Sequence, residues 1–296
     1  MTQTPTKIIN LKPYKIIYTN HHTSTKYKEI NAITNRLYLQ TYRRPSNIII
    51  NLVQPLLWLI LFGSLFQNAP ISLFGNDNIN MNIKYREFLN PGIIIFTAFN
   101  SAINSGLPII FDREFGFLNR ILTSPMINKK SLIYSCIIHT CLITNIQIIA
   151  IVLFNTYQIN NIPTFNELAT ILTTSTLVIT NISSLSICGA FILPGHIEFI
   201  ALTTLFINLP TLFASTALAP LSFMPYWLQI IVCMNPLTYA VEIIRQSRIE
   251  EFISLNTQII NTIWLKVQLK DSIGILIMAN IISFILVNKV IKYKYD

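Results

Sequence analysis

Charged residues are scarce in this chain of 296 residues. Asp, Glu, Lys and Arg together make up 11% of it, and hydrophobic residues make up 52%. A typical soluble domain carries about 25% charged residues. So little charge cannot cover the surface of an ordinary soluble protein, which excludes that class.

Glycine, cysteine and histidine are also rare, and each shortage excludes a kind of site. None of the 8 glycines begins the G-x-x-x-x-G-K-[ST] loop that holds nucleotide phosphates, so the chain itself is not expected to bind ATP. The 4 cysteines form no C-x-x-C pair and the 4 histidines form no cluster, so no disulfide framework, metal site or cofactor site is expected. Without a constellation of His, Asp or Cys, the chain is not expected to be an enzyme.

Long uncharged stretches are what the sequence has in abundance. Most of them exceed the roughly 18 to 20 residues that an apolar helix needs to cross a bilayer, whereas a membrane β-barrel would show short segments of alternating hydrophobicity. We therefore predict an all-α integral membrane protein. Its six transmembrane helices are expected near residues 48–67, 89–111, 132–154, 168–192, 200–221 and 272–288.

Two further segments complete the predicted layout. Residues 1–25 form a polar tail without the apolar core of a secretory signal, and the membrane domain covers residues 26–296. Lys26 to Arg44 has apolar residues at helical spacing, which fits either an amphipathic interfacial helix on the membrane or a surface helix that fixes topology. Three prolines interrupt the apolar stretch before the last span, which favours a re-entrant helical hairpin on the outer side.

The positive charges indicate how the spans are oriented. With the amino terminus inside, 15 of the 21 Lys and Arg residues lie on the inner side, as the positive-inside rule requires. Both termini are therefore expected on the inner, stromal or cytoplasmic, side. The net charge of +9 is explained by topology and does not indicate nucleic-acid binding.

The inner loop between the second and third spans is dense in charge for a chain that has little, reading DREFGFLNRILTSPMINKK over residues 112–130. A helix from Glu114 to Thr123 is expected, ended by Ser124 and Pro125. Such a loop suits docking of a soluble partner through ion pairs and one apolar edge, although a solvated connector fits the charges as well. Phe117, Ile121 and Leu122 are the side chains expected to pack, and Arg113, Glu114 and Arg120 those expected to face solvent.

A third informative block begins with Asn235, Pro236, Leu237, Thr238 and Tyr239. If Pro236 starts a helix, Glu242 and Arg245 lie three residues apart on one face and can pair. Pairing would lower the cost of placing charge near the membrane boundary. Glu242 could also pair with Arg248, but less directly, because the two residues are six apart.

Polar residues also recur within the second predicted span. Thr97, Asn100, Ser101 and Asn104 repeat at helical spacing. They could line a transport path or bond neighbouring helices, and helix packing is the more common use of such residues. The span interiors contain no ionisable acid or base, which argues against a proton or sodium relay.

Three blocks of the sequence resemble the permease subunits of the ABC type-2 transporter family, which export polysaccharides, lipo-oligosaccharides and drugs. They are Arg43 to Phe66, Phe88 to Met126 with its DREFGFLNRILTSPM ending, and Met234 to Gln246 (MNPLTYAVEIIRQ). The six-span layout agrees, so the resemblance covers nearly all of the chain after about residue 30. It is greatest to the version of this permease encoded in red-algal plastid genomes.

The resemblance implies roles for the motifs. It makes Lys26 to Arg44 an interfacial connecting helix and Asp112 to Ser124 a coupling helix that docks in an ATPase. The residues implied to take part in coupling are Asp112, Arg113, Glu114, Gly116 and Arg120. Those implied to belong to the outer hairpin are Asn235, Pro236, Tyr239, Glu242 and Arg245.

The same resemblance implies the partners and the mechanism. Two permease chains would form the export path, and separate ATPase subunits would hold ATP and Mg and drive it. The membrane would be that of a plastid or, alternatively, a bacterial inner membrane. Two other functions remain open at this point: a carrier or channel that needs no ATPase, and a structural or assembly subunit of a membrane complex.

Overall fold

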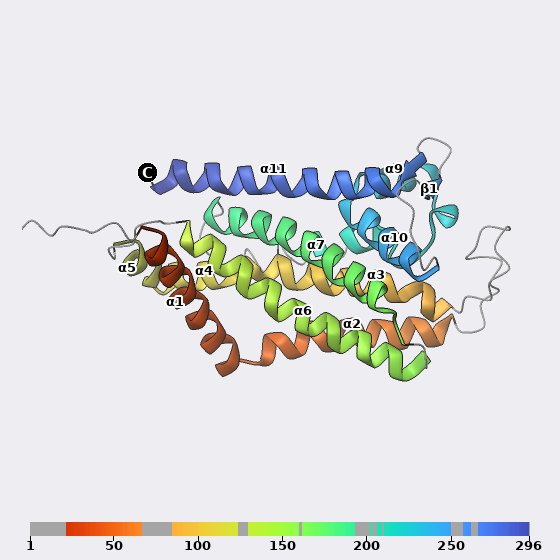
Figure 1. Cartoon of the computed structure of the whole chain (residues 1–296), viewed down its shortest axis with the longest axis horizontal. Helices are drawn as coiled ribbons and strands as arrows, with labels where there is room; N and C mark the ends of the chain where they lie inside the picture. Colours follow the sequence, from red (N-terminus) through yellow and green to blue (C-terminus); the bar gives the residue numbers. More distant parts are fainter. Residues whose placement is uncertain are drawn as a thin grey trace, which may run out of the picture.

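The computed structural model describes residues 22–66, 85–123, 130–159, 162–192, 202, 206–208, 210–249, 257–261 and 266–295. These residues are mainly helical, and the long helices run along the longest axis of the molecule (Figure 1). The predicted all-α class is confirmed, with one small β hairpin added. The long apolar helices are those of an integral membrane protein.

Five helical segments are long and apolar enough to cross a membrane in the described part of the chain. The second of these spans runs continuously through a short 3-10 turn, because α3 is followed directly by η2 and α4. The elements that make up the five spans are α2 (Ser46–Leu65), α3 (Tyr85–Ile103) with η2 (Asn104–Gly106) and α4 (Leu107–Glu114), α6 (Ser131–Ile159), α7 (Phe165–Ile192) and α11 (Leu269–Tyr295).

The fifth predicted span, residues 200–221, is the one that differs. It lies partly outside the described residues, and its described end is helical at 210–213 and then forms turns at 214–219. The sixth candidate span is instead the pair α9 (Tyr226–Met234) and α10 (Pro236–Ile249), which bend by 86° at a single residue. Pro220 and Pro225 flank the short helix η3 (Leu221–Phe223), and a proline removes a backbone donor, so no straight helix continues through this region.

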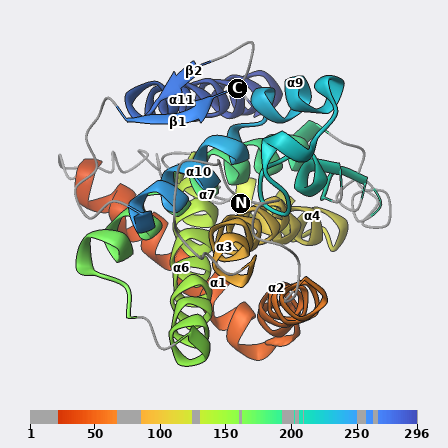
Figure 2. The same ribbon diagram turned by 90° about the vertical axis from the view of Figure 1, so that its right-hand side faces the viewer.

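The helices are arranged in layers around α3. Seen along the long axis, α7 and α3 lie between α11 on one side and α2 on the other (Figure 2). In the apolar 18-residue window of the α3–α4 span, 78% is buried inside the protein, against 17% in the corresponding windows of α2 and of α11. Most of α2 and α11 is therefore not buried within the described part of the chain, while α3 forms the centre of the core.

Two close backbone approaches fix this packing. A β-carbon added to Gly92 of α3 would lie 2.3 Å from the carbonyl oxygen of Ala217, and one added to Gly106 would lie 2.8 Å from that of Ser186 on α7. Small residues allow helices in membranes to approach this closely. The two glycines thus allow α3 to lie against the turn at 214–219 and η2 to lie against α7.

The first helix, α1 (His22–Arg43), packs across the start of α6. The Ser135 hydroxyl donates to the carbonyl oxygen of Ile30 at 3.1 Å, and the Tyr38 ring meets the His139 ring edge-on at 5.0 Å between centroids. Burial, with a smaller contribution from the Cys141 thiol, raises the pKa of Tyr38 above its ordinary value of 10.0. The predicted helix before the first span is present, and its place at a membrane surface stays a prediction.

A two-stranded antiparallel sheet, β1 (Gln258–Asn261) and β2 (Lys266–Gln268), leads into α11. Sequence reasoning did not predict it. In Figure 1 this hairpin lies with α9 and α10 at the end of the molecule opposite α5 (Phe117–Thr123) and the carboxyl end of α11. The two motif-rich regions of the sequence thus occupy opposite ends of the fold.

Candidate functional site

The loop between the second and third spans folds as two helices joined by a tight turn. The sequence predicted one helix from Glu114 to Thr123, which is wrong: α4 ends at Glu114, and α5 begins at Phe117. Gly116 causes the break, because its φ of 71° is left-handed, and its N–H donates to the carbonyl oxygen of Arg113 at 3.1 Å. A left-handed glycine after the last helical turn is a common helix end. Ser124 and Pro125, the predicted end of the helix, lie outside the described residues.

Of the three charged residues predicted to face solvent in this two-helix element, two are exposed, whereas Arg113 is half-buried and its prediction is wrong. Glu114 and Arg120 are exposed, and Phe115 is 77% exposed. The residue that anchors α5 is Leu118, which is 2% exposed, whereas the predicted anchor Phe117 is 41% exposed. Ile121 is partly buried. The element therefore presents two charges and an aromatic ring at the end of the molecule.

Arg36 of α1 connects this element to the rest of the protein. Its guanidinium forms an ion pair with Asp112 near the end of α4 and lies over the ring of Phe117 in α5, 4.9 Å from the ring centroid. A cation over an aromatic face is attracted by the ring quadrupole. One side chain thus links α1, α4 and α5.

The bend between α9 and α10 is formed by the Asn-Pro block. Asn235 precedes α10, and its side-chain oxygen accepts a hydrogen bond from the N–H of Leu237 at 3.0 Å, while Pro236 occupies the first helical position. Asparagine at this cap and proline at the next position are both strongly preferred helix starts. The Asn235 amide nitrogen also donates to the carbonyl oxygens of Thr211 and Ala214, at 3.1 and 2.7 Å.

The next two residues of the block bond back to the end of α9. The Thr238 hydroxyl donates to the carbonyl oxygen of Val232 at 2.7 Å, and the Tyr239 hydroxyl donates to that of Cys233 at 2.6 Å. The last carbonyls of a helix have no partners within it. The Asn-Pro-Leu-Thr-Tyr sequence is thus a rigid corner in which each polar side chain satisfies a backbone group.

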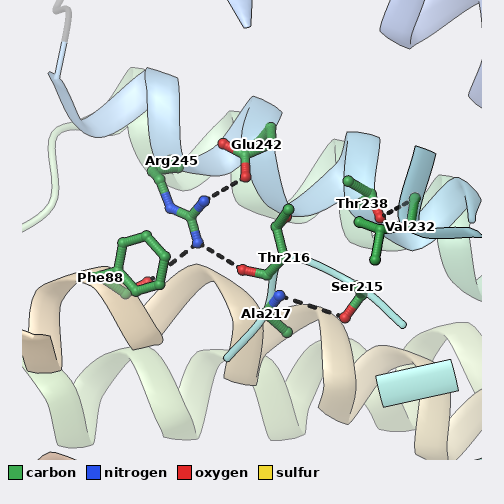
Figure 3. Close-up of polar contacts among 8 residues, drawn as sticks. All are labelled: Phe88, Ser215, Thr216, Ala217, Val232, Thr238, Glu242 and Arg245. Carbon is green, nitrogen blue, oxygen red and sulfur yellow. Dashed lines mark hydrogen bonds and ion pairs between the residues drawn. The ribbon is translucent and has the colours of Figure 1, made fainter. Parts of the chain in front are cut away.

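Arg245 of α10 joins three segments of the chain (Figure 3). It pairs with Glu242, as their spacing predicts, and its Nη2 donates to the carbonyl oxygens of Thr216 at 3.0 Å and of Phe88 at 3.5 Å. The guanidinium also stacks over the Phe88 ring at 3.9 Å. Arg245 therefore connects α10 to the turn at 214–219 and to the start of α3.

Arg248, three residues further, pairs with an acid that sequence reasoning did not consider. Its Nε donates to Glu167 Oε1 at 2.7 Å, and the two side chains are 19% and 10% exposed. Glu167 lies in the first turn of α7, 81 residues away in sequence. A signal existed, because Glu167 is the lone charged residue between Lys130 and Glu198.

The polar residues predicted in the second span lie at helix contacts. Asn100 donates to Gln54 on α2 at 3.3 Å, and Thr144 on α6 donates to Ser101 at 2.7 Å. Thr97 donates to a carbonyl oxygen of its own helix, and so does Asn104. Asn100 and Ser101 thus bond neighbouring helices, and Ser101 and Asn104 also line a cleft described below.

The described ranges contain no disulfide and no candidate metal site. All four cysteines, Cys136, Cys141, Cys188 and Cys233, are free thiols. No three His, Cys, Asp or Glu side chains come together in a geometry for a metal ion among the residues that the structure describes. The contacts observed at these sites connect helices and cap backbone groups.

Five long apolar helices and a bent sixth pair define this chain as a multi-pass membrane protein. The model of the ABC-2 type transporter family matches residues 28–248, which include the α4–α5 element and the corner with Glu242 and Arg245. The chain belongs to that family.

Similar proteins support this assignment over the full length. Proteins named ycf38, each described by name as a transport permease, occur in the red algae Porphyra purpurea and Pyropia yezoensis and in Cyanophora paradoxa. The Porphyra protein is 42% identical over 100% of both chains, and the Pyropia protein is 43% identical over 97% of both. The Cyanophora protein is 42% identical over 90% of this chain and 89% of its own.

Proposed function

We propose that this chain is the membrane-spanning permease subunit of an ATP-driven exporter, coupled to a separate ATPase subunit. The observation that carries the proposal is the α4–α5 element, which exposes Glu114, Phe115 and Arg120 at one end of the bundle while Arg36 ties its base to α1. An exposed element with a firm connection to the spans is what a docking lever requires. Family membership supports the same role.

The proposed mechanism is a change of shape without bond chemistry. Closure of the ATPase subunits on ATP pushes on α5, and the push passes through Arg36 to α1 and through α4 and η2 to α3. Because α3 is the buried centre of the bundle, its movement shifts the packed spans between two arrangements. Packed interfaces of this kind switch between discrete states more readily than they deform.

The corner at the opposite end has a complementary role in this proposal. The α9–α10 pair is a re-entrant hairpin on the outer side, and Arg245 and Arg248 attach it to α3 and α7. These attachments keep the outer end of the path closed until α3 and α7 move. In the same proposal α1 is an interfacial helix, and both termini face the stroma or cytoplasm.

The partners follow from the same reasoning. The lightly buried faces of α2 and α11 leave room for a second permease chain beside lipid. The ATPase subunits supply the site for ATP and Mg. The plastid membrane is the proposed location, because the full-length relatives occur in algae and glaucophytes.

Charge reversal on the lever tests this function. In the Glu114→Lys variant, membrane insertion should be unchanged, but co-purification of an ATPase with a phosphate loop should fall about tenfold, since docking loses an ion pair and gains a like charge. Glu87→Lys, the same substitution at the opposite end of the molecule, is the matched control and should retain the ATPase. Normal co-purification and transport in Glu114→Lys would contradict the assignment.

A further inference from the structure

A cleft of about 400 Å³ lies between α1, the start of α2, α6 and the η2–α4 segment. Its wall combines two chemistries. Hydroxyl, amide and imidazole groups come from α1 and α6, whereas Ile48, Ile50 and Ile143 contribute apolar side chains. Ile50 is 58% exposed, so the apolar part of the wall reaches the outer surface of α2.

Gln147 of α6 is the most informative residue of the cleft. It is 2% exposed and lines the cleft, yet neither its amide oxygen nor its amide nitrogen has a hydrogen-bond partner in the described part of the chain. Buried polar groups in folded proteins are almost always bonded. The unpaired oxygen and nitrogen of this buried amide are therefore available to bond a ligand in the cleft.

The charge of the cleft indicates the sign of that ligand. Arg44 is exposed at the rim, and it forms no ion pair within the described ranges. The lining contains no Asp or Glu, and Asp112, the nearest acid on α4, is paired with Arg36. Other groups that face the interior are neutral donors or acceptors, such as Thr41, whose hydroxyl is hydrogen-bonded to His139 Nε2 at 2.9 Å.

We propose that this cleft binds an amphiphile with a phosphate-bearing headgroup from the adjoining lipid leaflet, with Arg44 contacting the phosphate, Gln147 bonding the polar headgroup, and Ile48 and Ile50 contacting the first part of the chain. A planar guanidinium at the rim is well suited to phosphate oxygens. The volume fits a headgroup and a short length of chain, since small-molecule pockets span roughly 300–1,000 Å³. The proposal does not depend on coupling to an ATPase.

Binding to the purified full-length chain in detergent tests the proposal. Three probes separate its parts: phosphatidylglycerol, diacylglycerol with the same chains but no phosphate, and glycerol 3-phosphate with no chains. Phosphatidylglycerol should bind about tenfold more tightly than either of the others, because each lacks one contact set. Native mass spectrometry at several probe concentrations gives the three dissociation constants.

Variants locate the site. Gln147→Leu, of similar volume, and Arg44→Gln should each weaken phosphatidylglycerol binding about tenfold. Gln158→Leu is the matched control, because Gln158 is on the same helix but exposed, and it should bind like the original chain. If the buried substitution prevents folding, Arg44→Gln at the exposed rim carries the test.

Three results would overturn the proposal. Binding that is unchanged in both Arg44→Gln and Gln147→Leu would show that the cleft holds no headgroup. If diacylglycerol binds as tightly as phosphatidylglycerol, the cleft does not recognise the phosphate and the proposal is wrong. Glycerol 3-phosphate binding as tightly as phosphatidylglycerol would show a site for a free anion instead of an amphiphile.

Discussion

Arg248 near the end of α10 and Glu167 in the first turn of α7 form an ion pair, with Nε and Oε1 separated by 2.7 Å. Both side chains are mostly buried, at 19% and 10% exposure. The pair joins the bent hairpin to a spanning helix that contacts both α3 and α11. Among the described residues, it is the ion pair at this end of the molecule that joins the most distant parts of the sequence.

Breaking this pair should destabilise the protein more than removing it. Glu167→Leu leaves Arg248 without its partner, so the free energy of unfolding should fall by about 1.5–3 kcal/mol, the usual worth of a hydrogen bond to a charged group. The double variant Glu167→Leu with Arg248→Leu should recover part of that loss, since no buried charge is left unpaired. Thermal unfolding in detergent measures Glu167→Leu, Arg248→Leu and the double variant. A double variant whose loss equals the sum of the single losses would mean that the two residues do not interact.

The corner depends on Asn235 in two separable ways. Asn235→Asp keeps the acceptor that caps α10 but loses the two donors to Thr211 and Ala214, whereas Asn235→Ala loses both functions. Both variants should lower the melting temperature, each by an amount that corresponds to about 1–2 kcal/mol. Asn119→Ala on exposed α5 is the control and should leave the melting temperature unchanged. A corner variant that melts like this control would contradict the assigned hydrogen bonds.

Two glycines in helices should respond in opposite directions to the same substitution. Gly92→Ala places a β-carbon 2.3 Å from the Ala217 carbonyl oxygen, so α3 must move away from the turn at 214–219 and stability should fall by about 1–3 kcal/mol. Gly274→Ala meets nothing within 4 Å and should stabilise α11 by about 0.5–1 kcal/mol. Melting temperatures of the two variants decide the matter, and equal shifts would show that α3 does not approach Ala217.

The turn at Gly116 should matter for docking more than for stability. Gly116→Ala has open space around it but must adopt a φ of 71°, which costs roughly 1–2 kcal/mol for a residue with a β-carbon. Relief of that strain would extend α4 and redirect α5, so ATPase association should weaken while insertion is kept. Gly116→Asn tolerates the left-handed conformation better and should be milder. Equal association in both variants and the original chain would show that the direction of α5 is unimportant.

The spanning helices could be predicted from sequence because each is a long run without charge, which local composition reveals. The exception, residues 200–221, is equally apolar, and there the turns after residue 213 decide where a helix ends. Those turns depend on Asn235, which bonds to the segment from more than 20 residues away. Composition within a window carries no sign of such a contact.

The candidate sites were predictable to a similar, partial degree. Spacing on one helix predicted the pair of Glu242 and Arg245. Spacing could not predict that Arg36 pairs with Asp112 or that Arg248 pairs with Glu167. The partners of these pairs lie on different helices and are separated by 76 and 81 residues, respectively. Gly116 was visible in the loop, but the spacing of Phe117, Ile121 and Leu122 favoured one continuous helix, and the turn is seen only from the left-handed φ of Gly116.

The most direct test of the central claim is site-specific photo-crosslinking from α5 in native membranes. A crosslinking amino acid in place of Asn119, an exposed residue of α5, should capture an ATPase with a phosphate loop, identified by mass spectrometry. The same amino acid in place of Tyr157, 85% exposed near the far end of α6, should not. Capture of the ATPase from position 119 alone is the predicted result. No ATPase at position 119, or the same products from both positions, would contradict the proposed function.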